Sequence, residues 1–206
     1  GYLKGLFESS SIIANSDVNR VLLVAGDILS RKVSRRDRNS FPLIGDAITC
    51  TIVDRSNIVQ DYPMEIKYDG SGALAINIPA GGLANTCCDD TSVSTMDSDG
   101  NVRSLDQLVM KGRDVFTFTQ TTVMSFLSSF VMNYPSIKID RFFLHQANKF
   151  ILDRIRMKLK LTSEQLPSDV IKKYGNSSSA TIPLAMIEQY RAAELDALSE
   201  VVVLSG

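Results

Sequence analysis

The chain has a single histidine, and its setting is one in which side chains do chemistry. His145 follows the apolar stretch 139–144, and an amphipathic segment begins just beyond it. A strand that ends where a helix begins is a common way to hold an imidazole in a site. Asn176 lies at a second loop-to-helix junction of the same kind. An imidazole and an amide at two such junctions can converge on one carbonyl oxygen.

Other roles for these two residues stay open from position alone. A histidine at a strand end is often a hydrogen-bonded packing residue, and asparagine favours turns and helix caps. Gly175 before Asn176 and the small residues after it permit close packing around a buried amide, which favours a functional role there. Asn148 is predicted to be the N-cap of the helix that follows it.

The elements that would position these residues alternate along the chain. Short apolar or β-branched runs predict strands, and 3.6-residue spacing predicts helices. Strands are predicted at 21–25, 47–53, 73–78, 139–145 and 200–204, and helices at 1–14, 114–133, 149–160 and 178–195. The strand at 21–25 reads as buried on both faces, and the helix at 114–133 as central. Residues 89–101 read as a polar surface excursion. The alternation predicts an α/β fold with a mixed sheet between helices.

Composition excludes several classes of function. The chain has 206 residues, is 44% hydrophobic and carries a formal net charge of −1. It can bury a core of one or two domains, and it gives no electrostatic case for nucleic acid. No apolar run suggests a membrane span of roughly 20 residues. The three cysteines, Cys50, Cys87 and Cys88, lack metal-ligand spacing and are expected to be reduced thiols in a cytoplasmic protein.

Motifs spread over nearly the whole chain resemble those of the β-ketoacyl-acyl-carrier-protein synthase III family, in the thiolase superfamily. In chain order they are Gly1-Tyr2-Leu3-Lys4-Gly5-Leu6, Gly45-Asp46-Ala47, Met110-Lys111-Gly112-Arg113-Asp114-Val115-Phe116, His145-Gln146-Ala147-Asn148 and Gly175-Asn176-Ser177-Ser178-Ser179-Ala180. The resemblance implies the five-layered α-β-α-β-α thiolase fold, incomplete in this chain. Residues 1–55 would be the tail of the N-terminal half, and residues 56–206 the C-terminal half.

The same resemblance places the family's nucleophilic cysteine two residues before the position of Gly1. It also places the family's last turn and strand after Gly206, so we expect an internal piece of a longer protein or one part of a split chain. Such a piece is expected to be inactive alone.

For the complete protein the resemblance implies decarboxylative Claisen condensation of an acyl thioester, such as acyl-CoA, with malonyl-acyl carrier protein in fatty acid or related biosynthesis. His145 and Asn176 would be the catalytic hydrogen-bond donors, and no metal or other cofactor is expected. A cytoplasmic homodimer that binds acyl carrier protein is implied, with neither nucleic acid nor membrane as a partner. Two alternatives stay open: an acyltransferase of secondary metabolism with another acceptor, and a non-catalytic partner subunit that lacks the nucleophile.

The resemblance also nominates binding residues. Arg38 matches an arginine that packs on the adenine of coenzyme A, and Phe116 matches an aromatic residue near the pantetheine tunnel. The helix after His145 would dock acidic carrier protein through its basic residues, which are Arg154, Arg156, Lys158 and Lys160. An ordinary solvated face is an equally open interpretation of that helix. Phe150 departs from the arginine that is frequent in the family at this position, which weakens the transfer of carrier-protein contacts.

Overall fold

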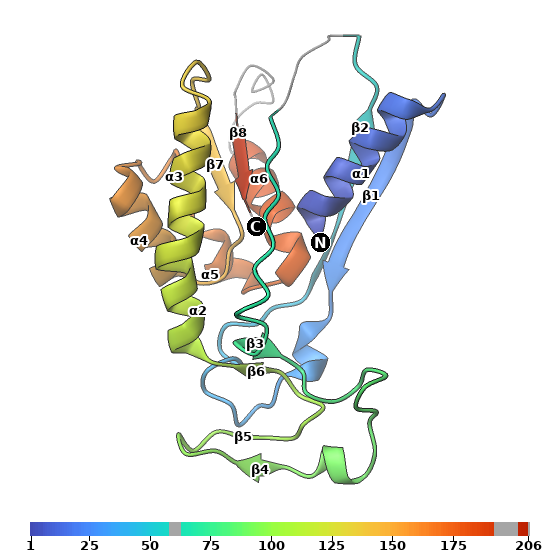
Figure 1. Ribbon diagram of the computed structural model, residues 1–206, viewed down its shortest axis with the longest axis vertical. Coiled ribbons are helices and arrows are strands. Elements are labelled where there is room, and N and C mark those ends of the chain that lie inside the picture. The colour runs from blue at the N-terminus through green and yellow to red at the C-terminus, as the bar shows by residue number, and fades with distance from the viewer. Residues whose placement is uncertain (58–62, 192–201, 206) are drawn as a thin grey trace.

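The computed structural model describes residues 1–57, 63–191 and 202–205 (Figure 1). Its first half contains α1 (Tyr2–Asn15), β1 (Arg20–Asp27), η1 (Leu29–Lys32), β2 (Ala47–Asp54), β3 (Ile76–Asn77), η2 (Asp90–Ser92), β4 (Thr95–Met96), β5 (Val102–Arg103) and β6 (Val109–Met110). Its second half contains α2 (Gly112–Phe118), the π-helical η3 (Thr119–Val123), α3 (Met124–Asn133), β7 (Arg141–Leu144), α4 (Lys149–Leu159), α5 (Val170–Tyr174), η4 (Ser178–Ala180), α6 (Thr181–Arg191) and β8 (Val202–Ser205).

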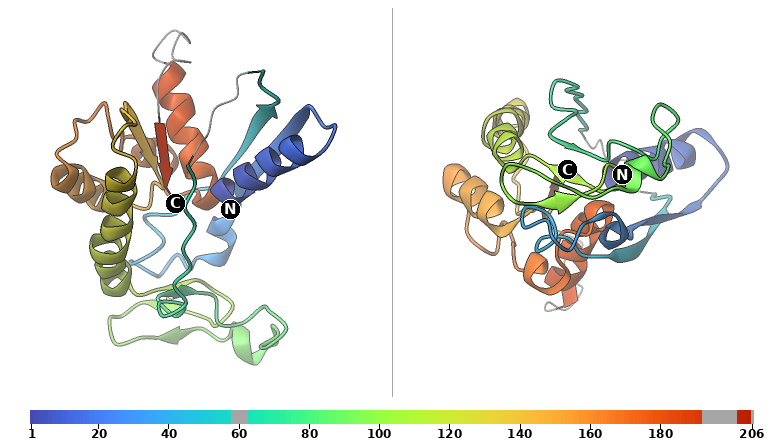
Figure 2. Two further views of the ribbon diagram at one scale, coloured as in Figure 1. Left: turned by 45° about the horizontal axis from the view of Figure 1, so that its top comes forward. Right: turned by 90° about the horizontal axis from the view of Figure 1, so that it is seen from below.

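The elements form a mixed α/β arrangement with α6 near its middle (Figures 1 and 2). On one side of α6 lie α1 and the antiparallel pair β1–β2, and on the other lie β7, β8, α4 and the run from α2 to α3. The short pairs β3–β6 and β4–β5 lie together at one end of the molecule. In the part of the chain that the structure describes, strands pair only two by two, and β7–β8 is the parallel pair.

Strand β7 lies between two hydrophobic clusters, because its successive side chains point to opposite faces. Phe142 and Leu144 belong to a cluster with residues of α3 and α4. Phe143 is fully buried in a second cluster with residues of α1, α5 and α6. Both faces of this short strand are therefore fixed by packing, and the residue that follows it is held at a defined place.

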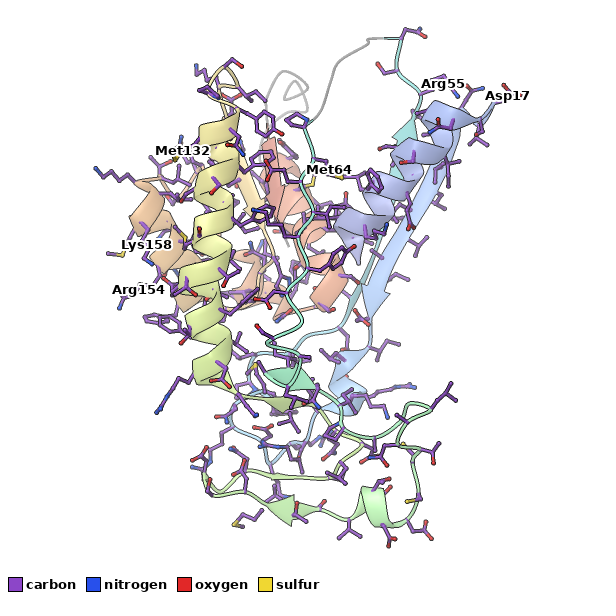
Figure 3. All side chains as sticks on the ribbon, viewed as in Figure 1. Asp17, Arg55, Met64, Met132, Arg154 and Lys158 are labelled. Carbon is purple, nitrogen blue, oxygen red and sulfur yellow. The ribbon has the colours of Figure 1, made fainter. Side chains whose placement is uncertain are left out.

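Arg55, just after β2, holds the C-terminal end of α1 (Figure 3). Its Nη2 donates to the carbonyl oxygens of Ile13, Ser16 and Val18 at 2.5, 2.6 and 3.1 Å. Its Nε donates to Asn19 Oδ1 at 2.8 Å. The last carbonyls of a helix lack partners within the helix, and a guanidinium satisfies them with charge of the favourable sign. This clamp fixes α1 against the β1–β2 pair.

The prediction that residues 21–25 are buried on both faces is wrong. Strand β1 alternates, with Leu22 and Val24 exposed and Ala25 buried. Its partner β2 likewise exposes Ile48 and Ile52. The inward face packs on α1 and α6, whereas none of the described elements covers the outward face. A continuous apolar run cannot reveal which of its faces has a neighbour.

The prediction of a long helix over residues 114–133 is confirmed in extent, but the helix is not central. Only Met124 and Leu127 are buried, and Met132 is 77% exposed. Contrary to the expectation that no apolar run suggests a membrane span, the helical run Gly112–Asn133 is long and apolar enough to cross a membrane, by length and composition only. Here it packs along one side against α4, in the cluster that contains Phe142 and Leu144.

Most other predicted elements are confirmed. The structure has helices at α1 and α4 and strands at β2 and β7, and Asn148 Oδ1 caps α4 by accepting from Ile151 N at 3.0 Å. The strand expected at 73–78 is only the two residues of β3. The helix expected at 178–195 begins with the 3₁₀ turn η4. Residues 192–201 lie outside the described residues, as do parts of the elements predicted there.

Candidate active site

His145 directly follows β7, and its backbone is held on both sides. The carbonyl of His145 accepts from Ala147 N at 2.9 Å. The fully buried Gln146 side chain donates from Nε2 to the carbonyls of Leu144 and Pro167, at 2.9 and 3.3 Å. Because β7 is packed on both faces and the next residues are tied to the backbone, the position of the imidazole is set by the fold.

Asn176 is placed by a close crossing of two chain segments. Gly45 N donates to Asn176 O at 3.0 Å, and Asn176 N donates to Leu43 O at 2.7 Å. A Cβ on Gly45 would lie 1.7 Å from Tyr174 O, so only glycine fits there. Gly175 has φ +65°, a conformation that glycine adopts at little cost. Thus the Gly45-Asp46-Ala47 motif fixes the asparagine motif some 130 residues later.

The two predicted catalytic residues meet at the turn η4. Asn176 Oδ1 accepts from Ser178 N at 3.0 Å, and His145 Nδ1 lies 2.7 Å from Thr181 Oγ1. No described residue accepts from Asn176 Nδ2, which leaves this amide nitrogen as an open donor. The side chains of His145 and Asn176 therefore both contact the short segment 178–181, and their catalytic role stays a prediction.

Gly1, the N-cap residue of α1, lies at the same turn. A Cβ on Gly1 would lie 2.8 Å from Ser179 Cβ, and the start of α1 lies beside the start of α6 (Figures 1 and 2). Ser179 Oγ also donates to Asp27 Oδ2, at the end of β1, at 3.3 Å. The amino end of a helix carries partial positive charge, which favours an anion there. The open amide of Asn176 and this helix end thus belong to one region of the molecule.

Burial lowers the pKa of His145 below its usual value. The carbonyl of Ser178 acts in the opposite direction and raises this pKa. The ring is therefore neutral near pH 7 unless a negative group lies next to it. A neutral imidazole can take a proton from a neighbouring acid, and a protonated one can donate from both nitrogens.

The loop that carries Arg38 is anchored by its neighbour Asp37, whose importance the sequence does not reveal. Asp37 is buried, and its carboxylate accepts from Arg103 Nη1 at 2.9 Å and from Ser40 Oγ at 2.9 Å. The backbone N of Arg38 donates to Asn101 Oδ1 at 3.0 Å, while the Arg38 side chain is exposed. An exposed guanidinium on a fixed backbone is compatible with the predicted stacking on adenine, which stays a prediction.

Phe116 is half-buried and stacks on Phe150, with ring centroids 5.6 Å apart. The guanidinium of Arg154 lies over the ring of Phe150, 5.3 Å from its centroid. The residue that replaces the family's frequent arginine thus joins α2 to α4 through an aromatic contact. Phe116 has a packing role here, and its predicted place at a pantetheine tunnel is untested.

The four basic residues predicted to dock a carrier protein differ in their surroundings. Arg154 and Lys158 lie on the outward side of α4 (Figure 3), and Lys158 Nζ donates to Gln120 O at 3.0 Å. Arg156 is half-buried and pairs with Asp153 at 2.8 Å. Lys160 is exposed at the left-handed C-cap of α4. The exposed cations suited to a partner are therefore Arg154, Lys158 and Lys160.

Two hollows of the described structure lie away from His145 and Asn176. One, of about 320 Å³, lies between α5 and α6 and is lined by Lys173 and Glu188 among others. The second lies beside Arg55. Among the described residues, no three His, Cys, Asp or Glu side chains are grouped to hold a metal ion. The three cysteines are free and exposed.

Comparison with known proteins agrees with the resemblance in the motifs. The family model for 3-oxoacyl-[acyl-carrier-protein (ACP)] synthase III matches residues 1–75, and the model for the C-terminal part of the same family matches residues 132–206. A chloroplastic β-ketoacyl-[acyl-carrier-protein] synthase III B of Cuphea wrightii is 30% identical over 96% of this chain and 50% of its own length. A β-ketoacyl-[acyl-carrier-protein] synthase III of Prochlorococcus marinus is 29% identical over 93% of this chain and 56% of its own length.

Solved structures give the same result for the fold. A crystal structure of a 3-oxoacyl-(acyl-carrier-protein) synthase III matches 99% of this chain and 61% of its own, with TM-score 0.91 and 29% identity. A crystal structure of the β-ketoacyl-[acyl-carrier-protein] synthase III of Thermus thermophilus matches 100% of this chain and 60% of its own, with TM-score 0.76 and 27% identity. The chain spans roughly half to three fifths of the length of the relatives named here. Its fold is thiolase-like, and with both family models matched in order, the chain belongs to the 3-oxoacyl-[acyl-carrier-protein] synthase III family.

Proposed function

We propose that the complete protein is a condensing enzyme that joins an acyl thioester to a malonyl group carried by acyl carrier protein, with release of CO2. One observation carries this proposal: His145 and Asn176 meet at η4, and the amide Nδ2 of Asn176 is left without an acceptor among the described residues. An open donor beside a titratable imidazole suits a reaction in which charge develops on a thioester oxygen.

In the proposed reaction, a cysteine thiol at the amino end of α1 loses its proton to His145 Nε2. The sulfur pair attacks the acyl thioester, the acyl carbon–sulfur bond of coenzyme A breaks, and the departing thiolate takes a proton from water. A helix amino end and an imidazolium both lower a thiol pKa. This charge pairing also offsets the burial that keeps the His145 ring neutral in the present structure.

The malonyl thioester then loses CO2, and its electron pair becomes an enolate. Asn176 Nδ2 and the protonated His145 Nε2 would donate to the enolate oxygen. The enolate carbon attacks the acyl-enzyme, and the cysteine leaves as thiolate, paired again with imidazolium. Each donor is worth on the order of 10² to 10³ in rate, because it is placed where charge appears in the transition state.

Acyl-CoA and malonyl-acyl carrier protein are the proposed substrates. Exposed Arg38 would meet the coenzyme, and Arg154, Lys158 and Lys160 would meet the acidic carrier. We further propose a cytoplasmic homodimer. The names of the relatives, which specify the acyl-carrier-protein class, support the choice of carrier.

The test is a condensation assay of the complete protein with a series of acyl-CoA chain lengths and malonyl-acyl carrier protein, read by mass spectrometry of carrier-bound product. Formation of 3-oxoacyl-carrier protein with stoichiometric CO2 is expected. Acylation of the protein without CO2 release would point instead to transfer to another acceptor. A protein that never becomes acylated would contradict an enzymatic role and indicate a non-catalytic partner subunit.

A further inference from the structure

Thr181, the first residue of α6, is fully buried against the imidazole of His145. Its Oγ1 lies 2.7 Å from His145 Nδ1 and donates to Ser178 O at 2.9 Å. Thr181 is five residues beyond Asn176 and was not singled out by the sequence pattern. Its side chain therefore ties the imidazole to the same turn that positions the amide.

The single hydroxyl hydrogen of Thr181 can serve only one of these two bonds. A threonine hydroxyl carries one proton, and a carbonyl oxygen can only accept. With the Thr181 proton directed to Ser178 O, the remaining hydroxyl lone pair faces His145 Nδ1. The Ser178 carbonyl also acts on the ring in the direction that favours protonation. The hydroxyl oxygen of Thr181 therefore calls for a hydrogen on Nδ1 of the imidazole.

We propose that Thr181 is a positioning residue that holds the proton of neutral His145 on Nδ1 and so keeps Nε2 as the proton-accepting nitrogen. The two ring nitrogens lie on opposite sides of the imidazole, so Nε2 is directed away from Thr181. This inference rests on the proposed function, in which Nε2 takes the thiol proton and then donates to the enolate oxygen. A ring with its proton on Nε2 instead would have no lone pair there for the thiol proton.

Two substitutions separate the hydroxyl from the volume of the side chain. Thr181→Val keeps nearly the same shape and removes the hydrogen-bonding oxygen. Thr181→Ser keeps the oxygen and removes a methyl group. If Thr181 acts through its hydroxyl, the valine variant loses about tenfold in kcat/KM for condensation, and the serine variant stays near the wild type. A purely structural role of the buried methyl group predicts the opposite order.

The direct readout is nitrogen-15 NMR of histidine-labelled complete protein, with His145 assigned by the signals lost in His145→Gln. The expected result is a protonated Nδ1 and an unprotonated Nε2 in the neutral wild type and in Thr181→Ser. In Thr181→Val both tautomers should be populated, and the pKa of His145 should fall because the imidazolium has lost an acceptor. The acid limb of the pH–rate profile should move to lower pH by the same amount.

A wild-type ring protonated on Nε2 would overturn the proposal, as would a valine variant with the wild-type tautomer and pH profile. Should the valine variant fail to fold, the tautomer of the wild type and of Thr181→Ser still decides. The NMR result does not depend on turnover. A wild type that shows the predicted tautomer but no condensation supports the role of Thr181 in holding the ring and refutes the proposed reaction.

Discussion

Replacing Gly45 by alanine should damage both stability and the placement of Asn176. The added Cβ would lie 1.7 Å from Tyr174 O, and the contact is with backbone, which no side-chain rotation can relieve. To make room, the segment with Gly45 must move away from the segment with Asn176 by on the order of 1 Å. The hydrogen bonds from Asn176 N to Leu43 O, 2.7 Å, and from Gly45 N to Asn176 O, 3.0 Å, would then be stretched to or beyond the limit of hydrogen bonding. Both bonds to the Asn176 backbone are thereby weakened or lost.

The expected loss follows from these contacts. Two backbone hydrogen bonds contribute about 1–3 kcal/mol together, and forced overpacking costs about 1–3 kcal/mol more. Gly45→Ala should therefore lower the free energy of unfolding of the complete protein by about 2–6 kcal/mol. Chemical denaturation measures this as a lower midpoint with an unchanged slope.

Gly112→Ala is the matched control. Gly112 begins α2, and a Cβ there would meet no atom within 4 Å. Alanine should leave stability unchanged or raise it slightly, because it favours the helix. A loss below about 1 kcal/mol in Gly45→Ala, or equal effects of the two substitutions, would refute the argument that this crossing holds the site.

Three further predictions concern charge. Asp37→Asn removes the buried carboxylate that pairs with Arg103 and should cost about 3 kcal/mol in chemical denaturation. Reversing Arg154 and Lys158 together to glutamate should raise the KM for malonyl-carrier protein and reduce its salt dependence, without affecting a small malonyl thioester. In the chain described here the folded pKa of His145 lies below its unfolded value near 6.5, so the stability that this residue contributes should be fully present above about pH 6.5 and fall as pH drops toward the folded pKa.

Each of these three has its own control. Asp99→Asn changes an exposed carboxylate close to the same loop and should have little effect on denaturation. Unchanged carrier kinetics after the double reversal would make the outward side of α4 ordinary solvated surface. His145→Gln should flatten the dependence of stability on pH below about pH 6.5. If stability still falls with pH in this variant, the pH dependence arises from other titratable groups.

Local sequence patterns were sufficient for the elements nearest the site. The apolar run before His145 predicts β7, and Asn148 predicts the start of α4, because strands and caps depend on neighbouring residues. The pairing of His145 with Asn176 came from the family motifs, and the structure supplies its physical basis in the turn η4.

Contacts between distant segments could not be predicted from the pattern. Two such contacts are the close approach of Gly45 to Gly175 and the contact of Thr181 Oγ1 with His145 Nδ1. Each joins residues that are far apart in sequence. The buried pairing of Asp37 could not be predicted either, because its partner Arg103 is 66 residues away. The helix 114–133 was misjudged as central for a related reason: apolar content does not say which faces have neighbours.

The most direct test of the central claim separates the two half-reactions in the complete protein with Asn176→Asp and Asn176→Ala. The aspartate variant keeps an oxygen to accept from Ser178 N but loses the Nδ2 donor. Both variants should slow CO2 release from malonyl-carrier protein on the order of 10² or more, while acylation of the nucleophile, followed by intact-protein mass spectrometry, stays near the wild-type rate. Equal losses in both half-reactions, or normal CO2 release in Asn176→Asp, would contradict the assignment of Asn176 as the donor to the enolate.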